Sequence, residues 1–376
     1  MLSTDARVFS PSSDVWHRTA GYGALFDELA LVVYTKAGSG VLAQRLGERV
    51  TLTPTNSISR PWYFADAYRC GVAIIARWIA SGKRPIAITC QDPFETGLVG
   101  YLIARRFNIP LQLQVHTDVA SPWFKRQGPL NRFRVLLARF LLRRADGVRA
   151  VSARVQQSLV TRFGVLPERI AVLPIHVAVA AASPASDRAD IRRRYARFDF
   201  IILMAGRLTR EKNVSLAIRA FSDVVRSYPN TLLLSVGDGP EQEHLKSQVA
   251  NLKIENNISF EPWADDLAPY CGAADLFMLT SNYEGYGRTP LEALAQGTPV
   301  LMTDVGIAGE LVRDRVHGLV VPVNSRSALA RGITFFLEHR EFLPAPLPPG
   351  ASEAEYLARY RDLLTQLAHS PSMAKA

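Results

Sequence analysis

Short apolar runs alternate along the chain with longer amphipathic segments, and this alternation predicts two successive sets of βα units. In the first half the apolar runs predict strands at Leu31–Tyr34, Pro85–Thr89, Leu111–Val115 and Val148–Val151. The amphipathic segments predict helices at Phe64–Ala80, Gly97–Phe107, Leu130–Arg144 and Ala153–Phe163. The second half repeats the pattern, with strands predicted at Phe200–Ala205, Thr231–Val236, Ile258–Phe260, Asp275–Thr280 and Pro299–Met302. Because strands that alternate with helices form parallel sheets, the predicted fold class is α/β, with two Rossmann-like doubly wound domains facing a central cleft.

Two turn-rich stretches mark the expected domain boundaries. Ala180–Asp190 lacks large apolar residues and predicts a linker over residues 180–198, and Leu343–Gly350 is rich in proline. Such compositions are typical of connecting segments. The chain is therefore expected to divide into one domain at residues 1–179, a second at residues 199–342 and a helical tail at residues 343–376. The tail has an apolar stripe that is expected to pack back on the first domain and consists of Tyr356, Leu357, Tyr360, Leu363 and Leu364.

Composition narrows the class of protein. The 376 residues are 48% hydrophobic, which excludes intrinsic disorder, and Lys and Arg total 44 against 34 Asp and Glu. Residues 1–180 carry 23 basic and 11 acidic side chains, whereas residues 181–376 carry 21 and 23, so the excess positive charge lies in the first half. Cys70, Cys90 and Cys271 lie too far apart for a disulfide framework or a zinc motif, and a reducing cytoplasm is expected. No apolar run approaches the roughly 18 residues of a spanning helix, so any membrane contact is expected to be peripheral.

A basic loop follows the predicted strand Phe200–Ala205. Its sequence is GRLTREKN at residues 206–213, and a helical segment comes next. Arg207 and Lys212 are thus expected near the carboxyl end of a strand and the amino end of a helix, where open α/β sheets bind ligands. A planar guanidinium and a compact ammonium together suit a diphosphate. The alternative is a basic loop that only faces solvent.

A glycine-containing loop with two glutamates follows the fourth predicted strand of the second half. Gly285 and Gly287 allow close backbone approach, and Pro290 lies where a helix would begin, so helix-start amides can face an anion there. Glu284 precedes that helix and Glu292 lies within it. Carboxylates beside a phosphate site are expected to hold hydroxyl groups, which favours a sugar and a ribose as their partners. The alternative is that the glycines only form turns and Glu292 is a surface residue.

Three segments together resemble the retaining nucleotide-sugar glycosyltransferases of GT-B fold, family 4 of the glycosyltransferase classification, also called glycosyl transferases group 1. They are GRLTREKN at 206–213, GDGPE at 237–241 and SNYEGYGRTPLEALAQGTPVLMTDVGIAGELV at 281–312. The resemblance implies that Arg207 and Lys212 bind the diphosphate of the donor and that Glu292 holds its ribose. It also implies that the second domain binds the donor and the first domain faces the acceptor.

The resemblance assigns further roles. Glu284, with Gly285, Tyr286 and Gly287, is expected to contact the donor sugar, and Glu284 and His116 are expected to be the catalytic residues. His116 directly follows a predicted strand; the alternative is a histidine that is hydrogen-bonded for structural reasons. No DxD motif follows a strand, and cationic side chains can replace a divalent ion, so no metal ion or cofactor is expected beyond the nucleoside diphosphate sugar.

The expected activity is transfer of a hexose-type sugar from a nucleoside diphosphate sugar to an acceptor hydroxyl, with retained anomeric configuration, in cell-surface polysaccharide or glycolipid synthesis. One alternative within the fold is a sugar-nucleotide epimerase. Another is a non-catalytic protein that binds nucleotide sugars.

The excess positive charge of the first half is concentrated at Phe124–Arg149, which holds eight basic residues and one acidic residue. Within it Leu130, Phe133, Leu137, Phe140 and Leu141 recur at helical spacing. One interpretation is a helix that lies on an anionic membrane surface and serves a glycan or lipid-linked acceptor on the inner face of the membrane. The other is a crossover helix whose apolar stripe covers the sheet. Nucleic acid is not expected, because no recognised binding motif accompanies the charge. The cations assigned to this acceptor or membrane side are Lys125, Arg126, Arg132 and Arg139.

Overall fold

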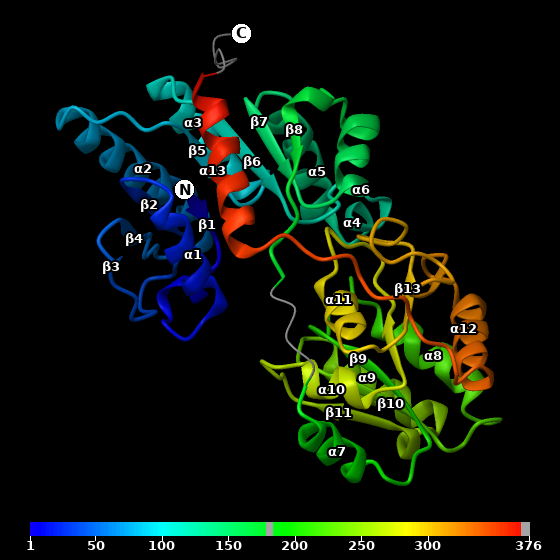
Figure 1. Ribbon diagram of the computed structural model, residues 1–376. Helices are drawn as coiled ribbons and strands as arrows, with labels where there is room; N and C mark the ends of the chain where they lie inside the picture. The colour runs from blue at the N-terminus through cyan, green and yellow to red at the C-terminus, as the bar shows by residue number, and fades with distance from the viewer. Residues whose placement is uncertain (178–182, 370–376) are drawn as a thin grey trace. The chain divides into compact units, whose positions relative to one another are not determined.

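The computed structural model describes residues 1–177 and 183–369 (Figure 1). Contacts divide the chain into two compact units: the first is Met1–His176 together with Ala351–Ala376, and the second is Val177–Gly350. Each unit has its own parallel sheet with helices packed on it, which confirms the predicted α/β class with two Rossmann-like units.

The sheet of the first unit has the strand order β3-β4-β2-β1-β5-β6-β7-β8, and all neighbours are parallel except β3 and β4. The strands are β1 (Leu2–Ser3), β2 (Leu29–Val33), β3 (Gln44–Leu46), β4 (Val50–Pro54), β5 (Ile88–Cys90), β6 (Leu111–Val115), β7 (Gly147–Ala150) and β8 (Ile170–Val172). The central strands β5, β6 and β7 are buried along their whole length, as expected for strands covered on both faces. The edge pair β3 and β4 was not predicted.

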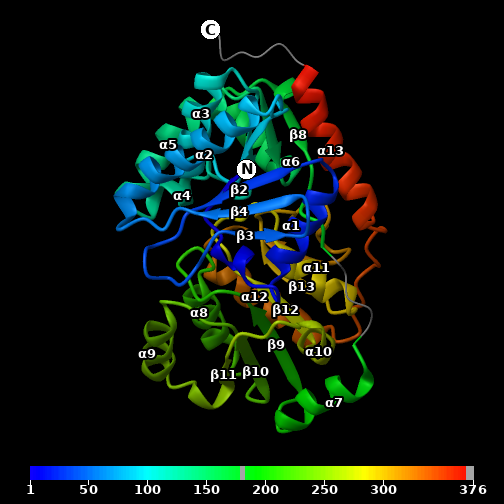
Figure 2. The same cartoon turned by 90° about the vertical axis from the view of Figure 1, so that its left-hand side faces the viewer.

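Helices cover both faces of this first sheet. They are α1 (Asp14–Ala24), α2 (Tyr63–Ala80), α3 (Glu95–Phe107), α4 (Pro122–Arg126), α5 (Pro129–Leu142), α6 (Ala153–Ser158) and α13 (Glu353–His369), with a π turn at Leu159–Phe163. Figure 2 shows α2, α3, α4 and α5 grouped on one side of the unit. Close packing requires glycine there: a Cβ at Gly97 of α3 would lie 2.8 Å from the Asp92 carbonyl oxygen and 3.3 Å from the Leu113 side chain.

Helix α13 packs on the other face of the first sheet, although it is the last helix of the chain. Tyr360 stacks on Tyr22 of α1 with ring centroids 4.4 Å apart, and Tyr356 donates to or accepts from the same Tyr22 hydroxyl at 2.7 Å. The apolar side chain of Leu367 lies against Gly147 of β7. Of the predicted tail stripe, Tyr356, Tyr360 and Leu364 are buried, whereas Leu357 and Leu363 are partly exposed.

The second unit has the strand order β11-β10-β9-β12-β13-β14, all parallel. The strands are β9 (Phe200–Ala205), β10 (Thr231–Val236), β11 (Ile258–Glu261), β12 (Leu276–Leu279), β13 (Val300–Thr303) and β14 (Gly318–Val321). The helices are α7 (Ala185–Arg194), α8 (Val214–Val224), α9 (Gln242–Leu252), α10 (Ala268–Ala273), α11 (Arg288–Ala295) and α12 (Arg326–Glu338). The order reverses between β9 and β12, and this switch point is where doubly wound sheets bind ligands.

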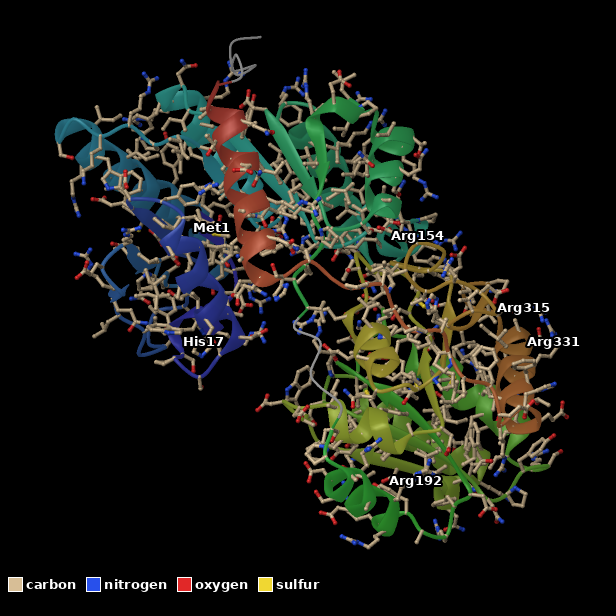
Figure 3. The ribbon with its side chains drawn as sticks, in the orientation of Figure 1. Met1, His17, Arg154, Arg192, Arg315 and Arg331 are labelled. Atoms are coloured by element: carbon tan, nitrogen blue, oxygen red, sulfur yellow. The ribbon has the colours of Figure 1, made fainter. Side chains whose placement is uncertain are left out.

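The stretch predicted as a linker, residues 180–198, is largely folded where it is described. Residues 180–182 lie outside the described residues, but α7 follows at once, with Ile191 buried. Arg192 of this helix (Figure 3) pairs with Asp275 at 2.6 Å, and Asp275 in turn accepts from the Ile201 amide of β9 at 2.7 Å. A polar helix with one buried apolar residue is therefore fixed to the second unit by charged contacts that the apolar pattern does not show.

Candidate functional site

The two candidate loops of the second unit meet at the switch point between β9 and β12. The hydroxyl of Thr280, directly after β12, donates to the carbonyl oxygens of Lys212 at 3.0 Å and Asn213 at 3.1 Å. The Asn282 amide donates to the Glu211 carbonyl oxygen at 2.8 Å. The loop after β9 and the loop after β12 are thus joined backbone to backbone, and their side chains share one site.

Lys212 and Glu284 form the charged centre of this site. The Lys212 ammonium donates to Glu284 Oε1 at 2.5 Å, and the same oxygen accepts from the Ser281 hydroxyl at 2.7 Å. Their side chains are only 23% and 14% exposed, so the pair is partly shielded from water. The family resemblance implies that Lys212 contacts a diphosphate and Glu284 a sugar; in the structure the two side chains are hydrogen-bonded to each other.

Arg207 is an exposed cation of the same loop. Its side chain is 68% exposed and contacts Glu211 at 3.2 Å, which is a surface ion pair of small energy. The guanidinium can therefore turn towards an incoming anion at little cost. Arg207 and Lys212 belong to the same short loop; Arg207 is exposed to solvent and Lys212 is held by Glu284.

The segment Gly285–Gly287 leads into α11. Gly287 has φ +92°, a conformation that favours glycine, and directly precedes Arg288, the first residue of the helix. Tyr286 is buried, which raises the pKa of its phenol, and its carbonyl oxygen accepts from the Ile307 amide at 2.9 Å. This segment is held by backbone contacts.

Glu292 lies on α11, facing Arg288 at 3.4 Å. Burial raises the pKa of its carboxyl group above the ordinary value, although the Arg288 guanidinium acts in the opposite direction. The side chain is partly buried, which argues against a role as an ordinary surface residue.

Three glycines of the second unit allow close approaches between backbone segments around the site. A Cβ at Gly237, after β10, would lie 2.1 Å from the Gly206 carbonyl oxygen, and one at Gly239 would lie 2.3 Å from that of Leu208. The segment 237–239 therefore forms the support of the basic loop. Gly306 supports the Tyr286 carbonyl in the same way, with a Cβ distance of 2.2 Å. In the sequence, only the glycines themselves indicate that two backbone segments lie close together at these positions.

His116 follows β6 in the first unit. Its Nε2 lies 3.1 Å from Gln114 Oε1. Burial, with the positive charges of Arg149 and Arg18, lowers the pKa of His116 to about 3, so the imidazole is neutral at ordinary pH. The hydrogen bond to Gln114 agrees with the alternative that His116 is a structural residue. The ring is partly exposed, however, as a residue that contacts a substrate must be.

The basic segment of the first unit forms α4 and α5. Lys125, Arg126, Arg132 and Arg139 are exposed, and none of them pairs with a carboxylate in the described part of the chain. A hollow between these helices is lined by Pro122 and the first three of these cations.

The apolar stripe predicted for this helix is only partly correct. Leu141 is buried against the sheet, as the crossover interpretation required, and Leu137 is partly buried. Leu130, Phe133 and Phe140 are instead exposed, because α5 turns Ala138, Leu141 and Leu142 towards the sheet.

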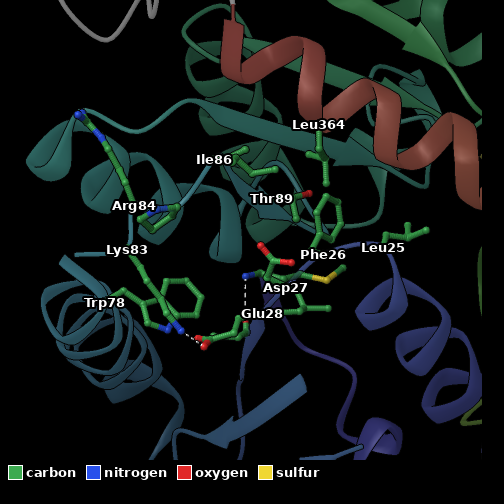
Figure 4. A pocket seen from close by; sticks show the side chains of 15 residues that line it. Leu25, Phe26, Asp27, Glu28, Trp78, Lys83, Arg84, Ile86, Thr89 and Leu364 are labelled. Carbon is green, nitrogen blue, oxygen red and sulfur yellow. Dashed lines mark hydrogen bonds and ion pairs between the residues drawn. The ribbon is translucent and has the colours of Figure 1, made fainter. Parts of the chain in front are cut away.

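A further hollow of about 510 Å³ lies in the first unit beside the amino ends of β1, β2 and β5 (Figure 4). Its wall includes Phe26, Trp78 and Leu364, and Lys83 pairs with Glu28 at its rim. None of the site residues predicted from the sequence lines it. It lies at the end of the strands opposite to the one where open α/β sheets bind their substrates.

Within residues 1–177 and 183–369, no group of three or more His, Cys, Asp or Glu side chains is placed to hold a metal ion. No helix in the same residues is long and apolar enough to cross a membrane.

Comparison with known families agrees with the fold and the loops. The family model described as "Glycosyl transferases group 1" matches residues 187–345, and the model described as "Glycosyl transferase 4-like domain" matches residues 13–176. The chain therefore belongs to the group 1, family 4 type glycosyltransferases of GT-B fold.

Similar proteins have been described in several bacteria. The chain is 30% identical over 242 residues to the alpha-monoglucosyldiacylglycerol synthase of Streptococcus pneumoniae, covering 61% of this chain and 54% of that protein. It is 29% identical over 329 residues to the D-inositol 3-phosphate glycosyltransferase of Streptomyces bingchenggensis, covering 81% of this chain and 72% of that one. The chain thus spans about half the length of the first relative and most of the second.

Solved structures share the fold at lower sequence identity. The Anabaena protein HepE in complex with UDP-glucose matches with a TM-score of 0.69 and 21% identity, covering 98% of this chain and 93% of HepE. Sucrose-phosphate synthase from Thermosynechococcus elongatus matches with a TM-score of 0.73 and 20% identity, covering 100% of this chain and 96% of that one.

Proposed function

We propose that this chain is a retaining glycosyltransferase that moves a hexose from a nucleoside diphosphate sugar to an acceptor hydroxyl. The observation that carries the proposal is the joined pair of loops at the β9–β12 switch point, with Arg207, Lys212 and Glu284 on them. HepE, which shares the fold, is known with UDP-glucose bound, and this supports a nucleotide sugar as donor. The chain would act in synthesis of a cell-surface polysaccharide or glycolipid.

The cations would stabilise the leaving group. When the bond between the anomeric carbon and the diphosphate breaks, its electron pair stays on the phosphate oxygen and negative charge grows there. Arg207 and Lys212 then stabilise the transition state more than the bound donor, which is what accelerates a reaction. Metal is not required on this proposal, because these two side chains and the amides at the start of α11 meet the diphosphate charge.

Retention would follow from attack on the face that the leaving group departs from. The acceptor oxygen forms the new bond to the anomeric carbon, and its proton passes to the departing phosphate oxygen. Glu284 is engaged by Lys212 and Ser281, so it is better placed to orient a sugar hydroxyl than to act as a nucleophile. Glu292 would hold the ribose hydroxyls.

The test is a panel of UDP-, GDP- and ADP-sugars, first by thermal shift and then by release of nucleoside diphosphate. A donor that binds the native state raises its melting temperature by mass action. We expect one donor to stabilise the protein and to release its diphosphate faster when an acceptor is added. Interconversion of donor sugars without release would favour the epimerase, and binding without turnover would favour a non-catalytic protein.

We further propose that the acceptor is glycan or lipid-linked and that the protein acts as a peripheral protein at the cytoplasmic face of an anionic membrane. The surface concerned, here called the α3–α5 patch, consists of exposed apolar and basic side chains on neighbouring helices. Its apolar members are Leu102, Leu130, Phe133, Leu136 and Phe140, and its basic members are Arg105, Lys125, Arg126, Arg132 and Arg139. Phe133 and Leu136 are 60% and 67% exposed.

Charge and apolar surface coincide on this patch, which is the combination that binds anionic lipid. Tyr101 of α3 and Phe140 of α5 are in edge-to-face contact, with ring centroids 5.9 Å apart, so the two helices adjoin at this point. The name of the Streptococcus pneumoniae relative refers to a glycolipid, which supports a lipid-linked acceptor.

Co-sedimentation with liposomes tests the membrane proposal. We expect binding to vesicles of phosphatidylglycerol and phosphatidylcholine at physiological salt, and no binding to phosphatidylcholine alone. The double variant Phe133→Ser and Leu136→Ser should abolish binding. The control is Leu343→Ser, which removes a still more exposed leucine, 84% exposed, from the second unit and should bind as wild type does. Absence of wild-type binding would remove the membrane proposal and leave the glycosyltransferase proposal untouched.

A further inference from the structure

A buried cation lies beside His116 in the first unit. Arg149 of β7 is 1% exposed, and no carboxylate of the described residues pairs with it. Its guanidinium donates instead to the carbonyl oxygens of Leu173 and Pro174, to Gln114 Oε1 at 3.0 Å and to the Tyr356 hydroxyl at 2.9 Å. Burying a charge without a counterion is costly, so these acceptors must hold it tightly.

Gln114 connects this cation to His116. Its Oε1 accepts from Arg149 and lies 3.1 Å from His116 Nε2, while its Nε2 donates to the Thr89 hydroxyl at 2.9 Å and the Tyr360 hydroxyl at 3.0 Å. A guanidinium can only donate, so the amide atom that faces Arg149 must be the oxygen. The amide orientation of Gln114 is therefore fixed by its neighbours.

The orientation of Gln114 fixes the proton of His116. Because Gln114 Oε1 can only accept, His116 must donate to it through Nε2–H. A neutral imidazole has one proton, so Nδ1 keeps its lone pair, and Nδ1 makes no hydrogen bond to the described residues. A second proton is opposed by burial and by the charges of Arg149 and Arg18. Burial raises the pKa of the Tyr356 and Tyr360 phenols, so both are neutral at ordinary pH, and the rings of Tyr22 and His176 pack against these two tyrosines.

We propose that Gln114 and Arg149, supported by Tyr356 and Tyr360 of α13, are positioning residues that hold His116 as the neutral Nε2–H tautomer and leave Nδ1 as a hydrogen-bond acceptor for a substrate hydroxyl. The identity of the hydroxyl rests on the proposed function; the tautomer does not. Helix α13 thereby helps to determine which imidazole nitrogen of His116 carries the proton. His116 acts by accepting a hydrogen bond, not as a general acid or a cation.

The tautomer is measured without any substrate, by nitrogen-15 NMR of histidine-labelled wild-type protein between pH 5 and pH 8. The signals of His116 are identified by their loss in His116→Gln. We expect a protonated Nε2 and an unprotonated Nδ1 throughout this range. A protonated Nδ1, or a titration centred near the ordinary histidine value, would overturn the proposal even if the protein proves to be a glycosyltransferase.

Gln114→Met and Gln112→Met form a matched pair of variants. Both glutamines are buried on β6 and face the same side, but Gln112 accepts from Thr89 and does not contact His116. We expect Gln114→Met to give a mixture of His116 tautomers and to lower kcat about tenfold or more, which is less than the roughly 100-fold loss expected when a direct catalytic hydrogen bond is removed. Gln112→Met should leave the His116 signals unchanged.

Tyr360→Phe is the milder variant, in case Gln114→Met does not fold. It removes only the hydroxyl that accepts from Gln114 Nε2, and we expect a smaller change of the His116 signals in the same direction. Unchanged His116 signals in a folded Gln114→Met protein would refute the proposal. Equal loss of kcat in the Gln114 and Gln112 variants would show that the role is structural only.

Discussion

Gly306→Ala perturbs the candidate donor site without changing any side chain assigned to it. Gly306 has φ +54°, and a Cβ there would lie 2.2 Å from the Tyr286 carbonyl oxygen and 3.0 Å from the Glu284 Cβ. The matched control is Gly309→Ala. Gly309 has φ +79°, in the same connection, but a Cβ there would meet nothing within 4 Å.

Both variants lose stability through backbone strain, but only Gly306→Ala also displaces a neighbouring segment. Each places alanine in the left-handed region, which costs about 1–2 kcal/mol of stability. Only Gly306→Ala must also move the backbone at Tyr286, by about 1 Å before the two atoms reach ordinary contact distance. A misplacement of about 1 Å at a reacting centre lowers the rate about 100-fold.

The assay combines thermal unfolding with release of nucleoside diphosphate from the donor identified in the panel. We expect similar losses of stability from the shared backbone cost, an additional loss in Gly306→Ala, and a fall of kcat/KM about 100-fold in Gly306→Ala alone. Wild-type kcat/KM in a folded Gly306→Ala protein would show that the Glu284–Gly287 segment does not position the donor. Equal loss of activity in both variants would show that the cause is backbone strain, not contact with Tyr286.

Three further predictions follow from the charges of the two units. Arg207→Ala should lower kcat at least about 100-fold, as expected for loss of one group that stabilises charge in the transition state, whereas Arg210→Ala, which removes an exposed arginine of the same loop, should leave kcat near the wild-type value. Turnover should persist in excess EDTA, and its abolition, restored by a divalent cation, would contradict a diphosphate site made of side chains. The pKa of His116 is lowered from 6.5 to about 3 on folding, so below about pH 6.5 the unfolded chain binds a proton that the native protein does not. The free energy of unfolding should therefore fall with decreasing pH by up to about 1.4 kcal/mol per unit, and His116→Asn should remove this part of the slope in chemical unfolding at pH 5 to 7.

The sequence predicted the central strands closely, because strands buried on both faces have a strong apolar signal. The bounds of β6, β9 and β10 agree with the predicted ranges, and β11, β12 and β13 differ by one or two residues at their ends. The edge strands β3 and β4 and the short strands β8 and β14 were not predicted, since half-exposed strands of three to five residues have no distinctive pattern. Helix α7 lies in the stretch predicted to be a linker, because its sequence ASDRADIRRR has a single large apolar residue, Ile191, and so lacks an apolar stripe.

The sequence predicted which loops form the candidate site, but it did not predict which side chains of those loops contact each other. The positions of Arg207 and Glu284 after two strands placed them at one edge of a sheet. The strand order that makes β9 and β12 neighbours, and so brings Lys212 to Glu284, depends on pairing between segments about 70 residues apart. The support given by Gly237 and Gly306 depends on distances of about 2 Å that only the folded backbone defines.

The contact between Lys212 and Glu284 couples binding of the donor diphosphate to recognition of the donor sugar. With side chains 23% and 14% exposed, the Lys212–Glu284 contact is a charge-assisted hydrogen bond, as is a hydrogen bond from a cation to a phosphate, and each contributes about 1.5–3 kcal/mol. A bound diphosphate can therefore draw Lys212 from Glu284 without a net loss when a hydroxyl of the donor sugar takes the place of the lysine. Glu284 would then keep its Ser281 hydrogen bond and have one oxygen free to accept from a sugar hydroxyl. On this argument a nucleoside diphosphate without its sugar would leave an uncompensated carboxylate at the site, and the intact donor would bind more tightly because its hydroxyl replaces the lysine.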